Sequence, residues 1–496
     1  MRRGAAVTVV LSLSSSAAAY GPAPNAELTS PARIQALAAA VTRDDCAEVI
    51  RLGAPIADAG ARAGLPADAE AEIQEVVASC EWRAGTTDAA YRHALRGTTL
   101  DEASEWLWRS RLALELTAKR YEDAVATIEA MSRGRGAALN SIDLGWMHLL
   151  NRELRDSHKT PARKRLLAVL ASDAYAPDQA YGPLESYRLE YARLLAEEGD
   201  KAAAAAQVRR LQSRHGISGA LFDSRLREWV DPGVDLRSAA ETALARYKEA
   251  AALYPDRLGP LVMAASELRS LGRPQEAVAL LDVARGRIDD PAGFEDREEQ
   301  LNWWWDELGR TYHQLGRYEE MVDAFRKGAA IAESGKNVSQ VINLAEAQNS
   351  FGRGEDALKT LAVFSDPERS TSPYGAMEMR FARGCAYAVA GRPSEAAADL
   401  AFARAHEKDH PEALADLLLC LGDMDGAAAA FIRRLEDPER RADALLQLSD
   451  YDAPPVARPP HPVESRLPAL KQRPDVQAAI AKAGGIRRIR LQRGEL

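Results

Sequence analysis

The chain has 496 residues, a length that at roughly 150 residues per domain would allow about three globular units. Hydrophobic residues make up 46% of it but aromatic residues only 6%, so the apolar fraction comes mainly from Ala, Leu and Val. This composition is typical of packed helices and argues against an all-β fold. With 64 Lys and Arg against 73 Asp and Glu, the formal net charge is −9, which argues against a nucleic-acid-binding or polybasic membrane-surface protein.

Residues 1–19 have the three parts of a secretory signal peptide: a basic start, a short apolar run and a small-residue cleavage site at Ala17–Ala19. A membrane span needs about 20 strongly apolar residues, whereas this run is shorter and is interrupted by serines. No later stretch is apolar enough to span a bilayer. We therefore expect cleavage after Ala19 and a secreted mature chain without an integral membrane segment, located in a bacterial periplasm.

A recurring turn predicts helical repeats in the second half of the chain. Each copy has Gly at the end of an apolar stretch, acidic residues after it and then a second amphipathic stretch. These turns begin at Gly272, Gly316, Gly352, Gly391 and Gly422. Gly suits a left-handed helix end, and acidic residues suit the N-terminus of the next helix. The spacings of 44, 36, 39 and 31 residues lie near the length of one helix-turn-helix unit, about 34 residues, so we predict an all-α chain.

Residues 302–335 hold the most specific copy of this pattern. Its signature positions are filled by Trp305, Leu308, Gly309, Tyr312, Gly316, Tyr318, Phe325 and Gly328. The arrangement resembles the tetratricopeptide repeat family, with Met321 in place of the usual Ala. Residues 377–410 also match well. The resemblance implies an α-solenoid, in which each two-helix unit buries its apolar face against its neighbours.

The resemblance is strong over residues 258–441, which we expect to form the repeat array, and weaker before them. Residues 20–257 are expected to form a divergent helical-repeat region. Within it, residues 140–183 and 219–242 fit no repeat, and Lys119 stands where a turn Gly would be expected.

The composition changes after the array. Residues 452–468 contain six prolines, which remove helix donors and favour extended geometry, so this stretch predicts a linker. Residues 469–496 allow a short closing helix followed by a basic tail, which is expected to be solvated or docked on the chain itself. Eight Lys and Arg against two acidic residues give residues 466–496 a local charge of +6.

The four cysteines are spaced as two pairs. Cys46 and Cys80 are 34 residues apart, and Cys385 and Cys420 are 35 apart, so each pair is separated by about one repeat. Each pair could therefore face each other on successive first helices and form a disulfide in an exported protein. The alternative is that the cysteines are free and pack as small apolar residues. The spacings are not those of a metal site, which places two Cys within a few residues.

The segment from His406 to His410 reads HEKDH, which formally matches a zinc-peptidase motif. On a helix this spacing puts two histidines on one face to hold zinc, with Glu407 as general base. However, the match lies where a repeat helix should end, and Pro411 follows at once. A connection between two repeats is the favoured interpretation, and a zinc-dependent hydrolase is the alternative.

A concave binding face is expected on the first helices of the repeats. Trp305 holds a packing position, whereas Trp303 would face the groove, because the residues of one helix face recur at helical spacing. The predicted groove residues are Trp303, Asp306, Arg310, His313 and Gln314, followed in the next repeat by Ile342, Glu346 and Asn349. One exposed aromatic among polar groups suits a peptide, although a merely solvated face would have the same sequence.

These observations favour a non-enzymatic scaffold that binds a protein or peptide partner through its concave helical surface. We expect no catalytic residue, metal, cofactor or nucleic-acid partner. Besides the zinc-dependent hydrolase, a structural subunit of a cell-envelope assembly is the other alternative.

Overall fold

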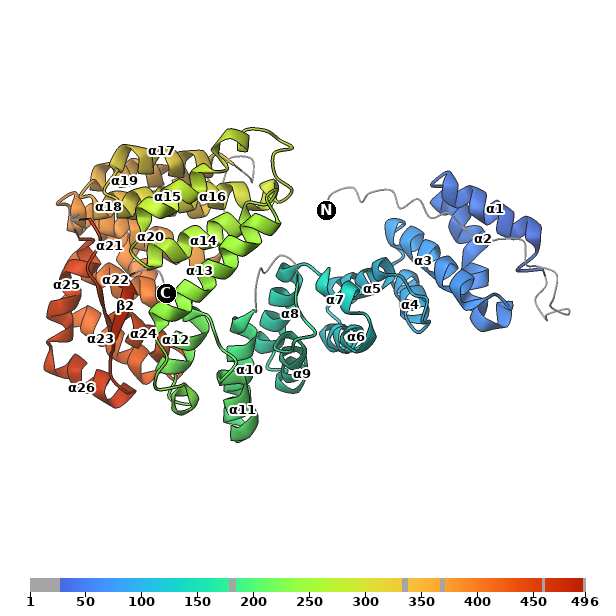
Figure 1. Ribbon diagram of the computed structural model, residues 1–496, viewed down its shortest axis with the longest axis horizontal. Helices are drawn as coiled ribbons and strands as arrows, with labels where there is room; N and C mark the ends of the chain where they lie inside the picture. Colours follow the sequence, from blue (N-terminus) through green and yellow to red (C-terminus); the bar gives the residue numbers. More distant parts are fainter. Residues whose placement is uncertain (1–26, 178–183, 332–337, 366–370, 457–459, 494–496) are drawn as a thin grey trace. The chain divides into compact units, whose positions relative to one another are not determined.

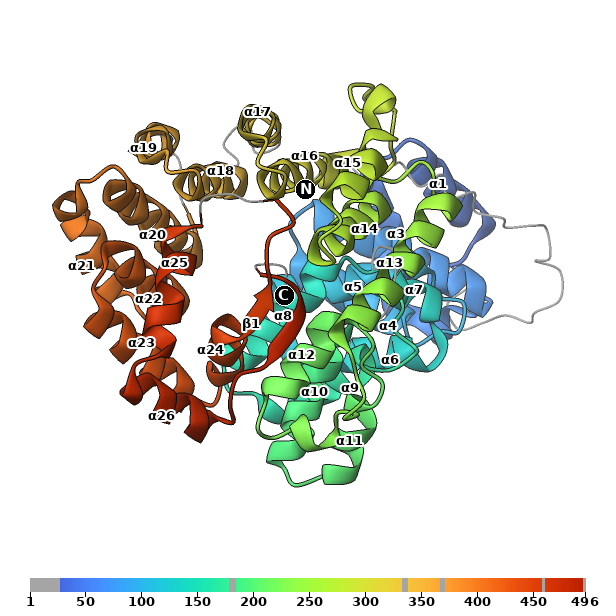
Figure 2. The same ribbon diagram turned by 60° about the vertical axis from the view of Figure 1, so that its left-hand side comes forward.

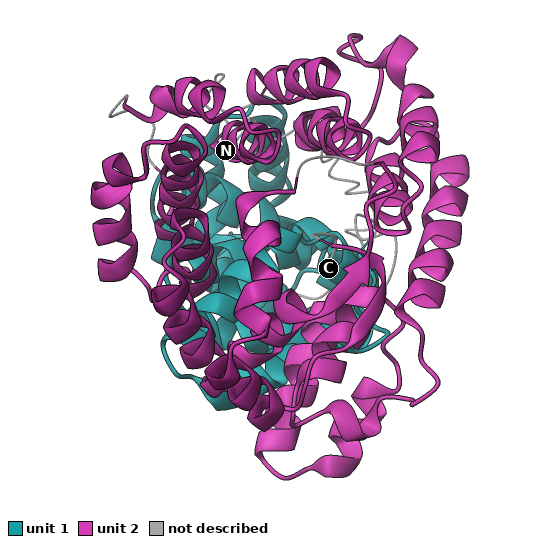
Figure 3. Cartoon of the chain, turned by 90° about the vertical axis from the view of Figure 1, so that its left-hand side faces the viewer, with its two compact units in different colours: residues 1–180 teal, residues 181–496 magenta. Residues whose placement is uncertain are grey.

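The computed structural model describes residues 27–177, 184–331, 338–365, 371–456 and 460–493. The predicted signal peptide lies outside these described residues. The chain divides into two compact units, residues 1–180 and 181–496 (Figure 3). None of the helices in the described residues combines the length and apolarity that a membrane crossing requires.

The first unit consists of helices packed mainly as consecutive antiparallel pairs (Figure 1). Its helices are α1 Pro31–Thr42, α2 Cys46–Ala59, α3 Ala67–Arg83, α4 Thr87–Gly97, α5 Glu105–Thr117, α6 Tyr121–Gly134, α7 Gly136–Asn140, α8 Leu144–Asp156 and α9 Thr160–Leu170. The pair α8 and α9 lies in a stretch for which the sequence predicted no repeat. The structure therefore extends the helix-hairpin pattern beyond the residues that carry the family resemblance.

The second unit continues the helix pairs and ends in a short pair of strands. Its elements before the C-terminal region are α10 Glu185–Glu197, α11 Lys201–Val208, α12 Arg214–Phe222, α13 Leu236–Leu253, α14 Gly259–Ser270, α15 Pro274–Asp282, α16 Arg297–Gln314, α17 Tyr318–Ala329, α18 Val338–Ser350, α19 Gly354–Leu361, α20 Pro373–Val389, α21 Ala397–Ala405, α22 Pro411–Leu421, α23 Met424–Glu436 and α24 Arg441–Leu448. The C-terminal region comprises β1 Asp450–Asp452, α25 Pro462–Lys471, α26 Pro474–Ala483 and β2 Arg488–Gln492.

A residue in the left-handed backbone conformation marks the turn inside nearly every helix pair. The five predicted turn glycines all have positive φ, between 71° and 79°. In the divergent region the same role falls to Gly85 and Gly199 and also to three other residues, Asp44, Lys119 and His158, whose φ is 54° to 56°. The predicted all-α fold of stacked helix-turn-helix units is confirmed, and Lys119 does adopt the conformation of the Gly it replaces.

Small residues allow the paired helices to approach closely. A Cβ placed on Gly309 of α16 would lie 2.9 Å from the ring of Phe325 on α17, so a larger residue would push the two helices apart. Met321, at the position where the family usually has Ala, is fully buried beside this contact. Trp304 is also fully buried and packs edge to face against Trp305, with ring centroids 4.7 Å apart.

The C-terminal region lies on the inner side of the curve formed by the repeat helices of the second unit (Figure 2). β1 and β2 pair in parallel, with Asp450 opposite Arg488. β2 packs against α13 and α14, α25 against α22, and α26 against α23. The helices of this unit curve far enough for α12 to contact α24.

The structure differs from the predicted linker and docks the basic tail on the chain itself, which was one of the two expectations for it. Residues 462–468 of the predicted linker form most of α25, which begins with Pro462 because a proline at the first helical position lacks only an N–H that would stay unpaired in any case. The basic tail forms β2, in which Ile489 and Leu491 are buried at alternate positions. The C-terminal region is therefore part of the folded unit.

Candidate functional site

Three consecutive tryptophans on α16 have different environments. Trp303 is 43% exposed, whereas Trp304 and Trp305 are buried in the core. Trp305 is buried, as expected for its packing position, and Trp303 is accessible, while its place in a binding groove stays a prediction. Trp303 is thus a large apolar side chain that α16 leaves accessible.

Asp306, a predicted groove residue, is buried between α16 and α18. Its carboxylate is buried, and it accepts hydrogen bonds from Arg310 Nε at 2.6 Å and from Asn343 Nδ2 at 2.7 Å. Because both oxygens are satisfied, Asp306 orients the guanidinium of Arg310 and holds α16 to α18.

Three other predicted groove residues tie neighbouring repeats together. His313 Nε2 lies 2.5 Å from Ser350 Oγ, Gln314 donates to the carbonyl of Arg269 at 3.0 Å, and Asn349 donates to the carbonyl of Ala382 at 2.9 Å. Gln314 and Asn349 are buried, while His313 is partly exposed. Asn349 is therefore a connection between α18 and α20 and does not offer its amide to a partner.

Arg310, His313 and Gln314 line one wall of a pocket of about 440 Å³ in the second unit. The other walls are built by the C-terminal region. Their lining residues come from β1 and the segment after it (Asp450, Tyr451, Asp452, Ala453, Pro454), from α25 (Glu464, Leu467, Pro468, Lys471) and from β2 (Arg488, Gln492, Arg493), with Arg269 contributed by α14. Three predicted groove residues thus line a pocket, whereas Trp303, Asp306, Glu346 and Asn349 are not among its lining residues. The C-terminal wall was not predicted, because that region was expected to be a linker and a tail.

Ion pairs hold the C-terminal wall of this pocket in place. Lys471 Nζ lies 2.5 Å from Asp450, where its hydrogen bond lowers the pKa of that carboxyl, and Arg488 lies 2.9 Å from Asp452. Arg493 donates to the carbonyls of Gln447 and Ser449 at 2.7 and 2.9 Å.

Cationic side chains outnumber acidic ones in the lining, and two of the cations, Arg269 and Arg310, pair with Glu307 and Asp306, which do not line the pocket. Five are cationic, namely Arg269, Arg310, Lys471, Arg488 and Arg493, and three are acidic, namely Asp450, Asp452 and Glu464. The lining is polar and apolar in similar measure. Arg493 donates to backbone carbonyls rather than to a carboxylate, which favours a ligand that carries a carboxylate.

Glu346 lies further along the inner face, among other carboxylates. Burial raises its pKa well above the usual range, and the neighbouring Glu378 and Asp416 add to the effect. Burial likewise raises the pKa of Asp416 to about 8. Glu346 was among the predicted groove residues, whereas Asp416 was not. Both stand six residues before a turn glycine, so a comparison of repeat positions could have added Asp416.

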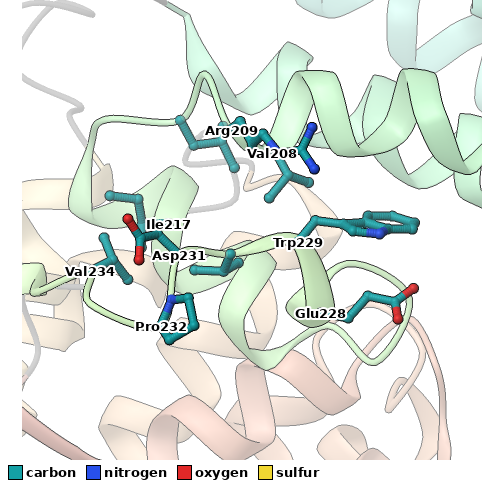
Figure 4. Close-up of a pocket in the computed structure, with 10 residues that line it drawn as sticks. Val208, Arg209, Ile217, Glu228, Trp229, Asp231, Pro232 and Val234 are labelled. Carbon is teal, nitrogen blue, oxygen red and sulfur yellow. The ribbon is translucent and has the colours of Figure 1, made fainter.

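A second pocket, of about 460 Å³, lies at the start of the same unit (Figure 4). Val208 and Ile217 come from the end of α11 and from α12, and Trp229, Pro232 and Val234 come from the segment leading to α13. Its lining is mainly apolar, with charged residues at Arg209, Glu228 and Asp231. No residue of this pocket was predicted as a site, because none belongs to a recognisable repeat.

The HEKDH segment forms the connection between α21 and α22. His406 follows the end of α21 and contacts Asp409 at 3.3 Å, whereas His410 contacts Glu378 at 2.6 Å, and Glu407 pairs with Arg433. The segment is not helical, so the two histidines do not share a helix face. The structure does not bring the residues of the zinc-hydrolase alternative together as a metal site.

Both cysteine pairs are joined as disulfides in the structure. Cys46 on α2 is bonded to Cys80 on α3, and Cys385 on α20 is bonded to Cys420 on α22. The Cys385–Cys420 bridge joins the first helices of successive pairs, as the spacing suggested. Cys46 instead begins the second helix of its pair, so its bridge joins that helix to the next first helix.

No family model matches this sequence, and no curated protein is significantly similar to it. Among solved structures, the chain is similar to the APC/C hetero-tetramer Cut9–Hcn1, with a TM-score of 0.28 and 10% identity over 91% of this chain and 96% of that one. It is also similar to yeast Tom70, with a TM-score of 0.25 and 13% identity over 90% and 96% of the two chains. A third is the P58(IPK) TPR domain, with a TM-score of 0.20 and 14% identity over 71% and 99%.

The class of this chain follows from its own helix pairs. The chain is an all-α helical-repeat protein built from stacked helix hairpins. Its repeats resemble the tetratricopeptide type: glycines in the left-handed conformation occupy the predicted turns, and Gly309 and Phe325 of residues 302–335 are in close contact.

Proposed function

We propose that the chain is an exported, non-enzymatic scaffold that binds an acidic segment of a partner protein in the pocket between α16 and the C-terminal region. The observation that carries the proposal is the composition of the pocket, in which predicted groove residues and the C-terminal wall together supply more cationic than acidic side chains. Its size falls within the range of about 300–1,000 Å³ typical of ligand sites, enough for a few side chains of a peptide.

Export to a periplasm is the second part of the proposal. It is supported by the signal-like residues 1–19 and by two disulfides, since disulfides persist mainly in oxidising compartments. A rigid array of helix pairs also suits a scaffold, because little ordering entropy is lost when a partner docks.

Site-specific photo-cross-linking in the bacterial envelope tests the proposal. A photoreactive residue at His313, which lines the pocket, is expected to capture a discrete partner, whereas one at Val283, which is exposed and does not line it, is not. The captured segment is then synthesised and titrated against the purified chain.

Two charge-reversal variants, one at a lining residue and one outside the lining, are compared in that titration. Arg488→Glu reverses a lining charge on β2 and is expected to weaken binding about tenfold. Arg490→Glu makes the same change two positions away, at an exposed residue that is not among the lining residues, and should leave the affinity within about twofold. Equal effects of the two variants, or a captured segment that is basic, would contradict the proposed site.

A further inference from the structure

The disulfide of the second unit lies beside a histidine from the C-terminal region. Cys385 Sγ is 3.6 Å from His461 Nε2, and the two sulfurs and a ring nitrogen all lie within 4.8 Å of one another. Both cysteines are buried. Within the described part of the chain, this is the one place where at least three potential metal-ligating side chains of His, Cys, Asp or Glu come this close together.

The fold fixes the position of His461 independently of the cysteines. His461 precedes α25 as its N-cap, and its Nδ1 accepts a hydrogen bond from the backbone N–H of Val463 at 3.3 Å. The ring packs against Phe381, with ring centroids 6.1 Å apart. Arg466 holds the same helix against the end of α22 by donating to the carbonyls of Leu419 and Cys420 at 2.7 and 2.8 Å. The ring nitrogen Nε2 is therefore held facing the sulfurs.

A carboxylate completes this cluster. Glu346 Oε2 lies 3.5 Å from His461 Nε2, and the other oxygen, Oε1, is buried without a hydrogen-bond partner. Buried oxygens without a partner are uncommon, because each loses its hydration without compensation. A cation or a cation-bound water beside His461 would satisfy this oxygen.

We propose that Cys385, Cys420 and His461 form a redox-gated site for a borderline-soft divalent cation, with Zn²⁺ as the expected ion. Two thiolates and one imidazole are a ligand set that zinc favours, at about 2.3 Å from sulfur and about 2.0 Å from nitrogen. A water beside Glu346 takes the fourth position. In the disulfide form both sulfurs are bonded to each other, so the site binds metal only after reduction.

The reaction that opens the site is a thiol–disulfide exchange. A dithiol reductant supplies two electrons and two protons, the Cys385–Cys420 bond breaks, two thiols form and the reductant becomes a disulfide. Metal binding then releases the two thiol protons, because thiolates are the ligands.

Binding also affects the imidazole. While Nδ1 accepts from Val463, the neutral ring carries its proton on Nε2. Metal coordination at Nε2 moves that proton to Nδ1 and removes the hydrogen bond from Val463. Occupation of the site therefore loosens the first turn of α25, which forms part of the pocket wall. The site itself does not depend on the proposed peptide binding.

Cobalt titration of the full chain tests this proposal, since Co²⁺ bound to thiolates in a tetrahedral site has charge-transfer and d–d absorption bands. A Cys46→Ser/Cys80→Ser variant leaves only the proposed pair. After treatment with a dithiol and its anaerobic removal, this variant should bind one Co²⁺ per chain with thiolate bands, and Zn²⁺ should displace it. The oxidised form should bind none.

Matched variants separate the ligands from the rest of the fold. The reciprocal Cys385→Ser/Cys420→Ser variant retains the other pair, which has no third ligand among the described residues, and should lose the bands. His461→Ala should weaken binding at least about tenfold, and Glu346→Gln should change it less. Circular dichroism of each reduced variant checks that the helices remain folded. The proposal is overturned if the reduced Cys46→Ser/Cys80→Ser chain shows no thiolate bands, whether folded or not, or if His461→Ala binds Co²⁺ as tightly as its parent.

Discussion

Arg225 donates a hydrogen bond to Glu439, 214 positions later in the sequence, with Nη1 3.1 Å from Oε1. The two residues lie where α12 meets α24, so the repeat helices of the second unit close on themselves. Arg225 also forms a bidentate pair with Asp223, at 2.9 and 2.7 Å. The Asp223 side chain is only 4% exposed, whereas that of Glu439 is 69% exposed. Arg225 also pairs with Glu197, so it compensates one buried carboxylate and two exposed ones.

Removal of Arg225 and removal of Glu439 should have unequal effects on the free energy of unfolding. Burial raises the pKa of Asp223, but the hydrogen bonds and charges of Arg225, together with Arg193, bring it below the usual range. Arg225→Ala leaves this carboxylate with Arg193 and the backbone N–H of position 225, and is expected to lower the free energy of unfolding by about 2 kcal/mol. Glu439→Ala breaks only an exposed pair and should change it by less than about 0.5 kcal/mol. Urea denaturation followed by circular dichroism measures both, and similar losses would show that Asp223 does not depend on Arg225.

Where no atom of the surrounding structure lies close to a turn glycine, we expect that glycine to be required only for its backbone conformation. Gly391 has a φ of 78°, and a Cβ added to it would contact nothing within 4 Å. Gly391→Ala is therefore expected to lose about 1 kcal/mol because an L-residue is strained in this conformation. Gly286 has the same open surroundings but no positive φ, so Gly286→Ala should leave stability unchanged or raise it by up to about 1 kcal/mol. Thermal unfolding of the two variants compares them, and equal losses would exclude the conformational explanation.

The repeat array could be predicted because its determinants are local. A glycine in the left-handed conformation, such as Gly316, has a recognisable residue type and recurs near a fixed spacing. Lys119 and His158 adopt the same conformation without that residue type, so the hairpins that they close carry a weaker signal. Trp304 shows a second limit of prediction from sequence. Three tryptophans follow one another in the sequence, and the burial of Trp304 is seen only in the packed structure.

The C-terminal wall of the pocket could not be predicted because its contacts are distant in sequence. β2 pairs with β1, and Asp450 lies opposite Arg488, 38 positions later. Prolines dominate the intervening stretch and suggest extended chain, although Pro462 stands at a position where a helix tolerates it. The basic residues around Ile489 and Leu491 are similarly typical of a solvated tail. In the structure they belong to a strand that buries Ile489 and Leu491.

Leu491 provides a direct test of whether β2 is part of the folded unit. Its side chain is fully buried, so Leu491→Ala should lower the free energy of unfolding by about 3 kcal/mol through lost packing and the cavity left behind. The adjacent Arg490 is exposed, and only its backbone carbonyl is engaged, by Arg237 at 3.4 Å. Arg490→Ala should therefore change stability by less than about 0.5 kcal/mol. If Leu491→Ala is equally silent in urea denaturation, the segment behaves as a detachable tail.

A pH-dependent contribution to stability is expected in the first unit, where His93 bridges two carboxylates. Its Nδ1 lies 2.8 Å from Glu81 and its Nε2 lies 3.1 Å from Asp58. Burial alone would lower the pKa of His93, but the hydrogen bonds and charges of Glu81 and Asp58 outweigh it, and the pKa is raised. The folded state therefore binds this proton more tightly than the unfolded chain, whose histidine pKa is about 6.5. The resulting stability is fully present below about pH 6.5 and is lost as pH rises through the folded pKa.

His93→Gln isolates this contribution, because glutamine retains hydrogen-bonding capacity but cannot be charged. The variant should be less stable than the parent chain at pH 6, and the difference between the two should shrink as pH rises, by up to about 1.4 kcal/mol for each unit by which folding raises the pKa. His148→Gln, a change at an exposed histidine of the same unit, is the control and should show little such trend. Urea denaturation at pH 6, 7.5 and 9 measures all three chains. A difference between the parent and His93→Gln that is constant across this range would mean that Glu81 and Asp58 do not hold a proton on His93 in the folded state.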